Sequence, residues 1–119
     1  GTAEIYTEVE RFKEVKESIV VGQSWDNDVR IILFIVMNTK FYLTEDLLKK
    51  IKFQIKKNAS PRHVPSKIIQ VKDIPRTKSG KIVELAVKNI LDGNNIKNKE
   101  ALANPEALKQ FKNLKELSN

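Results

Sequence analysis

The stretch Val29-Arg30-Ile31-Ile32-Leu33-Phe34-Ile35-Val36-Met37 decides the fold of this 119-residue chain. Apart from Arg30 it is an unbroken apolar run. A strand with apolar side chains on both faces is typical of the centre of a sheet that is covered above and below. The run therefore predicts a buried central strand and requires helices on both faces of the sheet.

Two further strands are predicted around this one. Residues 18–22 are short and β-branched, and residues 24–28 are turn formers, which together predict a β-hairpin ending in the central strand. A third strand is predicted over residues 67–71, after two X-Pro steps that favour extended backbone. The fold class that follows is α+β, with an α/β-layered arrangement of a hairpin and a roughly three-stranded sheet between helices.

Helices are predicted at four places. The first follows Thr2, and the second follows Thr44, whose side chain is a good N-cap. The third covers residues 83–91 and ends before Gly93, a typical C-cap residue. The fourth begins at Asn104-Pro105, because proline is favoured at the first helical position.

Composition excludes several classes of protein. A length of 119 residues allows one domain, and the absence of cysteine excludes disulfides, thiolate nucleophiles and Cys-based zinc sites. We expect a reducing, cytoplasmic environment. The longest apolar run, Ile31–Met37, is far shorter than the roughly 20 residues of a membrane helix, and the acidic residues 1–10 do not resemble a signal peptide.

The net charge of +7 is concentrated in the middle of the chain. Residues 49–81 hold eleven basic side chains and one acidic side chain, whereas residues 1–48 hold five basic and nine acidic ones. Such a block attracts nucleic acid, an acidic membrane surface or a phosphate-rich coenzyme, and it is also found on simple solvated helix faces. Charge alone leaves these alternatives open.

Few residues are suited to catalysis. His63 is the single histidine, and no cysteine accompanies it, so a transition-metal site or a catalytic triad is not expected. Carboxylates are sparse where the basic residues are dense, which disfavours a paired-carboxylate acid/base site. Lysine is the remaining candidate.

The most informative lysine lies in the run Pro75-Arg76-Thr77-Lys78-Ser79-Gly80-Lys81-Ile82. A Walker phosphate loop needs Gly five positions before the Gly-Lys pair and Ser or Thr after it, and this chain has Pro75 and Ile82 there. The residues instead predict a compact turn in which Gly80 permits unusual backbone angles. Its last lysine, Lys81, is then either an ordinary surface residue or a point charge placed for phosphate.

The run resembles the final core motif of the adenylate-forming superfamily of acyl-CoA synthetases, adenylation domains and luciferases: Pro, Lys or Arg, Thr, any residue, Ser or Thr, Gly, Lys. Gly1–Ile5 looks like the end of the hinge-proximal motif that opens their mobile C-terminal domain. Ser60–Pro65 and Asn98–Leu108 are similar more narrowly to the acetoacetyl-CoA synthetases. The resemblance covers essentially the whole chain.

This resemblance implies a C-terminal lid domain over residues 1–97, with a helical tail over residues 98–119 that docks on it. The large N-terminal ATP- and acyl-binding domain would lie outside this sequence, so we expect the isolated chain to be inactive. Lys81 would enter the active site for adenylation and leave it when the domain rotates for thioester formation. The same motif supplies its supporting loop: Pro75, Arg76, Thr77, Ser79 and Gly80.

The resemblance also implies substrates and partners. Acetoacetate, ATP with Mg²⁺, and CoA would give acetoacetyl-CoA, AMP and pyrophosphate. Lys56 corresponds to a basic CoA-phosphate contact of related acetyl-CoA synthetases, with Lys57 and Arg62 as neighbours. Acylation of Lys81 by a modifying enzyme would remove its charge.

Three other interpretations remain open on the sequence: an acetyl- or other short-chain acyl-CoA synthetase domain, a small basic nucleic-acid-binding module, and a structural or interaction domain. Aromatic residues make up 7% of the chain, and only Phe53 lies within the basic block, which provides no base-stacking platform. This argues against nucleic acid as a partner, and a membrane partner is not expected either.

Overall fold

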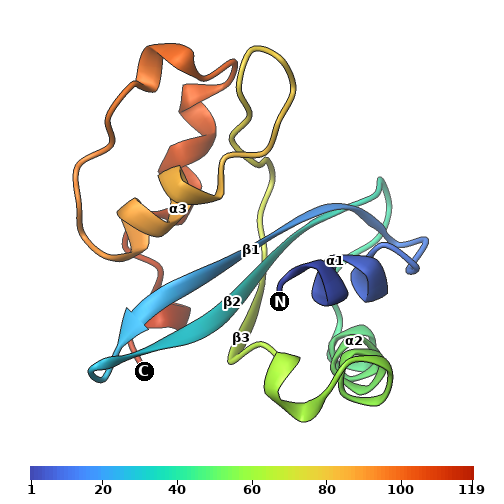
Figure 1. Cartoon of the computed structure of the whole chain (residues 1–119). Helices are drawn as coiled ribbons and strands as arrows, with labels where there is room; N and C mark the ends of the chain where they lie inside the picture. The colour runs from blue at the N-terminus through green and yellow to red at the C-terminus, as the bar shows by residue number, and fades with distance from the viewer.

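The computed structural model describes all residues, 1–119. Figure 1 shows a small sheet between two groups of helices, with α1 and α2 on one side and α3 with the C-terminal segment on the other. No helix is of a length and apolarity that would let it cross a membrane. The helices are α1 (Ala3–Val9), α2 (Glu45–Asn58) and α3 (Glu84–Leu91), with 3₁₀ helices at Pro61–His63, Lys99–Ala101, Pro105–Phe111 and Lys115–Leu117. The strands are β1 (Val15–Trp25), β2 (Asp28–Met37) and β3 (Lys67–Gln70).

Strand β2 is the centre of the sheet, as the apolar run predicts. The order is β1-β2-β3, with β1 antiparallel and β3 parallel to β2. Leu33 pairs with Val20 and Ile68, while Phe34 pairs with Ile19 and Ile69. Because successive side chains point to opposite faces, these two rows belong to two different cores. The predicted α+β class and the cover on both faces are confirmed.

The first core lies between the sheet and the pair α1 and α2. Ile5 and Val9 of α1 and Ile51 and Ile55 of α2 are all fully buried against it. Their spacing of four residues places them on one face of each helix. These contacts explain why both helices are amphipathic, with the lysines of α2 on the outer face.

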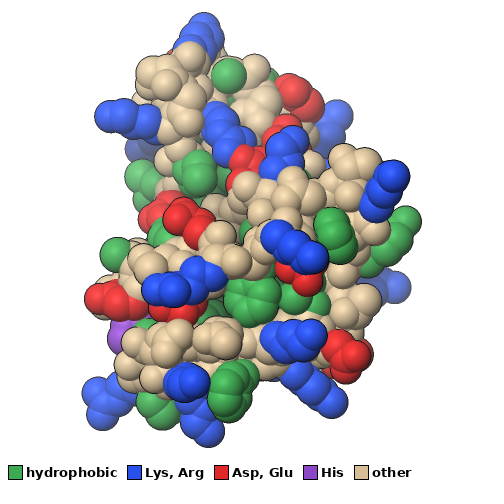
Figure 2. Space-filling model, turned by 90° about the vertical axis from the view of Figure 1, so that its right-hand side faces the viewer, with side chains coloured by type: hydrophobic (Ala, Val, Ile, Leu, Met, Phe, Trp, Pro, Cys, Tyr) green, Lys and Arg blue, Asp and Glu red, His purple; other side chains and the backbone are tan.

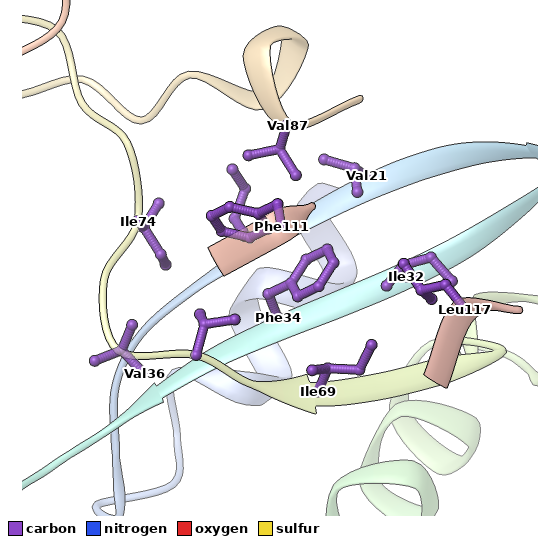
Figure 3. Close-up of a cluster of buried hydrophobic side chains, with 11 residues drawn as sticks. Val21, Ile32, Phe34, Val36, Ile69, Ile74, Val87, Phe111 and Leu117 are labelled. Atoms are coloured by element: carbon purple, nitrogen blue, oxygen red, sulfur yellow. The ribbon is translucent and has the colours of Figure 1, made fainter. Parts of the chain in front are cut away.

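The second core lies between the opposite face of the sheet, α3 and the C-terminal segment. Figure 3 shows Phe34 of β2 meeting Phe111 of the segment Pro105–Phe111, with Val87 of α3 beside them. The two phenyl rings are edge to face, with centroids 4.8 Å apart. Leu117 is also buried here, so the 3₁₀ helix Lys115–Leu117 contributes to the core.

The hairpin is longer than predicted, and its turn is shorter. Strand β1 begins at Val15 and continues to Trp25, and only Asp26 and Asn27 form the turn. Their φ angles are 51° and 59°. Asp and Asn tolerate this left-handed conformation, which a two-residue hairpin turn with the correct twist requires. The prediction of a turn over residues 24–28 was wrong in extent because pairing continues across Ser24 and Trp25.

The helix ends agree with the sequence to different degrees. The Thr44 hydroxyl accepts a hydrogen bond from the Leu47 amide (3.2 Å), which confirms the predicted cap of α2. Thr2 occupies the N-cap position of α1 but makes no side-chain capping bond. Gly93 follows α3 with a φ of +76°, as expected of a C-terminal glycine. The helix predicted to begin at Asn104-Pro105 does begin there, but it is a 3₁₀ helix, the common form of short helical segments.

The contact between Phe34 and Phe111 should contribute strongly to the free energy of unfolding of the domain. We expect Phe111→Ala to lower the free energy of unfolding by about 3–5 kcal/mol, because it leaves a cavity under β2. Phe53→Ala is the matched control: Phe53 is 60% exposed, and its loss should change stability by less than about 0.5 kcal/mol. Urea denaturation of both variants tests this, and equal losses would contradict it.

Candidate active-site loop

The candidate site is the loop that joins β3 to α3. Arg76 and Ile82 form an isolated antiparallel bridge across it. The Thr77 amide donates to the Lys81 carbonyl (2.8 Å), and the Val83 amide donates to the Pro75 carbonyl (3.1 Å). The run therefore folds back on itself as a small hairpin, with Lys78 to Gly80 at its tip. Figure 1 shows it projecting beyond the sheet, next to α3.

The tip depends on one glycine and two hydroxyls. Gly80 has a φ of +90°, and its amide donates to the Thr77 carbonyl (2.9 Å). The Thr77 and Ser79 hydroxyls are hydrogen-bonded to each other (2.9 Å), and the Thr77 hydroxyl also accepts from the Lys81 amide (3.1 Å). The hydroxyls that the motif specifies therefore hold the turn in shape around the backbone of Lys81.

Lys81 has a fixed backbone and a free side chain. Its amide and carbonyl are both used within the loop. Its side chain is exposed and takes part in no ion pair or hydrogen bond. The ammonium group is therefore accessible to a partner outside the chain. Its role in adenylation stays a prediction at this point.

Two interactions that the sequence did not indicate connect this region to the sheet. Arg76 forms a partly buried salt bridge with Glu17 of β1. The Tyr6 hydroxyl of α1 donates to Glu84 Oε1 (2.6 Å), at the start of α3, and accepts from the Val20 amide (2.8 Å). Burial, together with the Glu84 carboxylate, raises the pKa of Tyr6 far above its usual value, so it remains a donor. No periodicity or motif marks such pairs, because their partners are distant in sequence.

The second group of candidates lies elsewhere. Lys56 and Lys57 are in the last turn of α2, and Arg62 is in the 3₁₀ helix that follows; all three side chains are exposed. Figure 1 places these elements at the opposite end of the molecule from the Lys81 loop. In Figure 2, Lys and Arg side chains protrude from this end. The two groups therefore form separate surfaces of the domain and cannot hold the same phosphate together.

The single histidine, His63, is part of the local structure. Its Nδ1 is 2.6 Å from the Ser60 hydroxyl. The structure contains no group of three or more His, Cys, Asp or Glu side chains that could hold a metal ion.

Comparison with known proteins identifies the family of this chain. The profile of the AMP-binding enzyme C-terminal domain matches residues 5–81. The chain belongs to this family, as the motifs at both ends of that range indicate.

More particular relatives are acetoacetyl-CoA synthetases. The chain is 58% identical over its full length to acetoacetyl-coenzyme A synthetase of Rhizobium meliloti (strain 1021), and 46% identical to acetoacetyl-CoA synthetase of Xenopus tropicalis. It covers 18% of the length of each. The solved acetoacetyl-CoA synthetase of Streptomyces lividans superimposes with a TM-score of 0.85 at 37% identity, over 93% of this chain and 17% of that one. The predicted resemblance is confirmed at both levels.

The positive φ angle of Gly80 predicts how substitution of this residue affects stability. Gly80→Ala should cost about 1–2 kcal/mol of stability, because an L side chain disfavours positive φ, although no atom lies within 4 Å of the added methyl position. Gly80→Asn should cost less, since Asn enters this region more readily. Thermal unfolding of the two variants, with amide exchange of Lys81, measures the difference. Indistinguishable behaviour of Gly, Ala and Asn would contradict the assigned turn.

Proposed function

We propose that this chain is the C-terminal lid domain of an AMP-forming acid–thiol ligase that makes acetoacetyl-CoA, AMP and pyrophosphate from acetoacetate, ATP and CoA. One observation carries the proposal: similarity to acetoacetyl-CoA synthetases continues through residues 82–119, beyond the range of the family profile. The partner of the domain would be a large N-terminal domain that binds ATP and the acid. Without it, the isolated chain would be inactive.

Lys81 would act in the first half-reaction. An acetoacetate carboxylate oxygen attacks the α-phosphorus of ATP, and the bond from that phosphorus to the bridging oxygen of pyrophosphate breaks. Negative charge develops on the oxygens around the phosphorus, and a protonated Lys81 ammonium close to them offsets it. Magnesium would enter with the nucleotide and neutralise phosphate charge there. The rigid backbone and free side chain of Lys81 suit this role.

The second half-reaction would use another face of the domain. The CoA thiolate attacks the acyl carbon of the adenylate, and AMP leaves. The basic end formed by Lys56, Lys57 and Arg62 is suited to the phosphates of CoA. Since it lies at the opposite end of the molecule from the Lys81 loop (Figure 1), a rotation of the domain would exchange one surface for the other at the active site.

The other interpretations are less well supported. Family membership favours the ligase domain over a nucleic-acid-binding module or a purely structural domain. A synthetase for acetate or another short acid is the remaining competitor, and replacing acetoacetate by acetate in the assays below distinguishes it. A cytoplasmic location, suggested by the absence of cysteine, stays part of the proposal.

Substitution of Lys81 tests the proposed function. In the complete synthetase, Lys81→Ala should lower acetoacetate-dependent pyrophosphate release by about 10²-fold or more, because transition-state charge loses its counterion. Thioester formation from supplied acetoacetyl-adenylate should be retained. Acylation of Lys81 should give the same split, because it also removes the charge.

The matched control is Lys78→Ala, a substitution at an exposed lysine in the same loop. It should leave both half-reactions within about 2-fold, as expected of a surface residue. Unchanged pyrophosphate release by Lys81→Ala, or equal loss in both half-reactions, would contradict the role assigned to Lys81.

Substitution of the basic end tests the CoA surface. Lys56→Ala and Arg62→Ala should each raise the KM for CoA by about 3- to 10-fold, the effect of losing one charged phosphate contact. Pyrophosphate release in the absence of CoA should not change, and Lys56→Arg should retain affinity. Lys50→Ala, at an exposed lysine earlier on α2, is the control. Equal KM values for all these variants would place the CoA contacts elsewhere.

A further inference from the structure

The segment after α3 is hydrogen-bonded to the chain that leads into the Lys81 loop. Asn104 Oδ1 accepts a hydrogen bond from the Arg76 amide (2.8 Å). Its Nδ2 donates to the Ile74 carbonyl (2.8 Å) and to Asp73 Oδ2 (2.9 Å). The half-buried side chain of Asn104 is thus bonded to three residues of the chain that leads into the loop.

Backbone bonds strengthen this attachment. The Ala103 amide donates to the Arg76 carbonyl (2.8 Å), and Leu102 forms an antiparallel bridge with Thr77. The hairpin of the Lys81 loop therefore has a third strand-like neighbour, which comes from residues 102–103. Because Arg76 and Thr77 are paired with Ile82 and Lys81 on their other side, displacement of residues 102–104 would displace the base of the loop.

The side-chain amide of Gln110 makes similar hydrogen bonds to residues that lie just before those bound by Asn104. Gln110 Oε1 accepts from the amides of Lys72 and Asp73, the latter at 3.1 Å, and its Nε2 donates to the Asp73 carbonyl (3.2 Å). The segment that carries Asn104 and Gln110 is itself anchored in the protein interior. Its buried side chains are Leu102, Ala107, Leu108 and Phe111.

The loop has few anchors of its own. Between the end of β3 and the start of α3 the chain has no helix or strand, and Lys78, Ser79, Gly80 and Lys81 are all exposed. Ile74, which is fully buried in the second core, anchors the chain just before the loop. Beyond it the position of the loop depends on polar contacts, which come from the salt bridge of Arg76 with Glu17 and from residues 102–110.

We propose that Asn104 is a positioning residue for adenylation, which fixes the base of the Lys81 loop so that the Lys81 ammonium reaches the reacting phosphate. This inference rests on the proposed function of Lys81. Asn104 lies 23 positions after Lys81, outside residues 5–81 that match the family profile. The loop motif and the segment that orients it are thus separate parts of the chain.

The test uses the complete synthetase with Asn104→Ala. Pyrophosphate release in the presence of saturating acetoacetate and ATP should fall by about 10- to 100-fold in kcat, the cost of misplacing a catalytic group by about 1 Å. KM values should change little, and thioester formation from supplied acetoacetyl-adenylate should be retained. Amide exchange at Arg76, Thr77 and Lys81 should become faster.

Asn38→Ala is the matched control. Asn38 is also half-buried, and its Nδ2 donates to the Lys13 carbonyl (2.7 Å), a contact that involves none of the residues hydrogen-bonded to Asn104 or Gln110. It should change neither half-reaction nor exchange in the loop. The comparison thereby separates a general loss of stability, which both variants would share, from a displacement of the Lys81 loop, which only Asn104→Ala should cause.

A second variant pair covers the case in which Asn104→Ala does not fold. Asn104→Asp brings a carboxylate to the Asp73 carboxylate and to the Ile74 carbonyl and should impair adenylation, while adding Asp73→Asn restores a donor to that carboxylate. The adenylation rate should recover by about 3- to 10-fold, on the order of one hydrogen bond. No recovery would overturn the proposal.

Two other results would also overturn it. Asn104→Ala with normal adenylation, measured alongside an inactive Lys81→Ala, would leave the proposed function intact and reject the positioning role. Equal loss in both half-reactions, without faster exchange in the loop, would make Asn104 a structural residue only. If Lys81→Ala were fully active, the proposed function itself would fail, whatever the behaviour of Asn104.

Discussion

Strand β2 is buried on both faces, and the arrangement of the helices follows from this burial. Ile32, Leu33, Phe34 and Ile35 are all fully buried. Because their side chains alternate in direction, neither layer of helices can be removed without exposing half of them to water. This requirement explains why α1 and α2 cover one face and why α3 must share the other with residues 105–117.

The position of the candidate site follows from that arrangement. β3 runs parallel to β2 and is reached through α2, so the chain emerges from the edge of the sheet and must still return to place α3 on the second face. The return path is the segment that carries the motif. It lies outside the sheet, where the side chain of Lys81 is exposed. Its backbone is held in position by contacts with Glu17 and Asn104.

The candidate residues of the basic block, residues 49–81, lie in separate parts of the fold. Lys81 lies in the loop, whereas Lys56, Lys57 and Arg62 lie at the other end of the molecule. Arg76 is different again, because the salt bridge with Glu17 uses its charge within the protein. Candidate residues that belong to one basic block in the sequence are thus divided between the loop, the end of α2 and a partly buried ion pair.

The central strand, the cap at Thr44, the glycine that follows α3 (Gly93) and the motif around Lys81 could all be predicted from the sequence, because each depends on local periodicity or backbone preference. It also carried the family resemblance. Tertiary structure decided the length of the hairpin, the 3₁₀ form of Pro105–Phe111, the bond from Tyr6 to Glu84 and the attachment of Asn104 to Asp73, Ile74 and Arg76. The physical reason is clearest for the bonds of Tyr6 and Asn104, whose partners lie far apart along the chain, so that only packing on the two faces of β2 brings them within hydrogen-bonding distance.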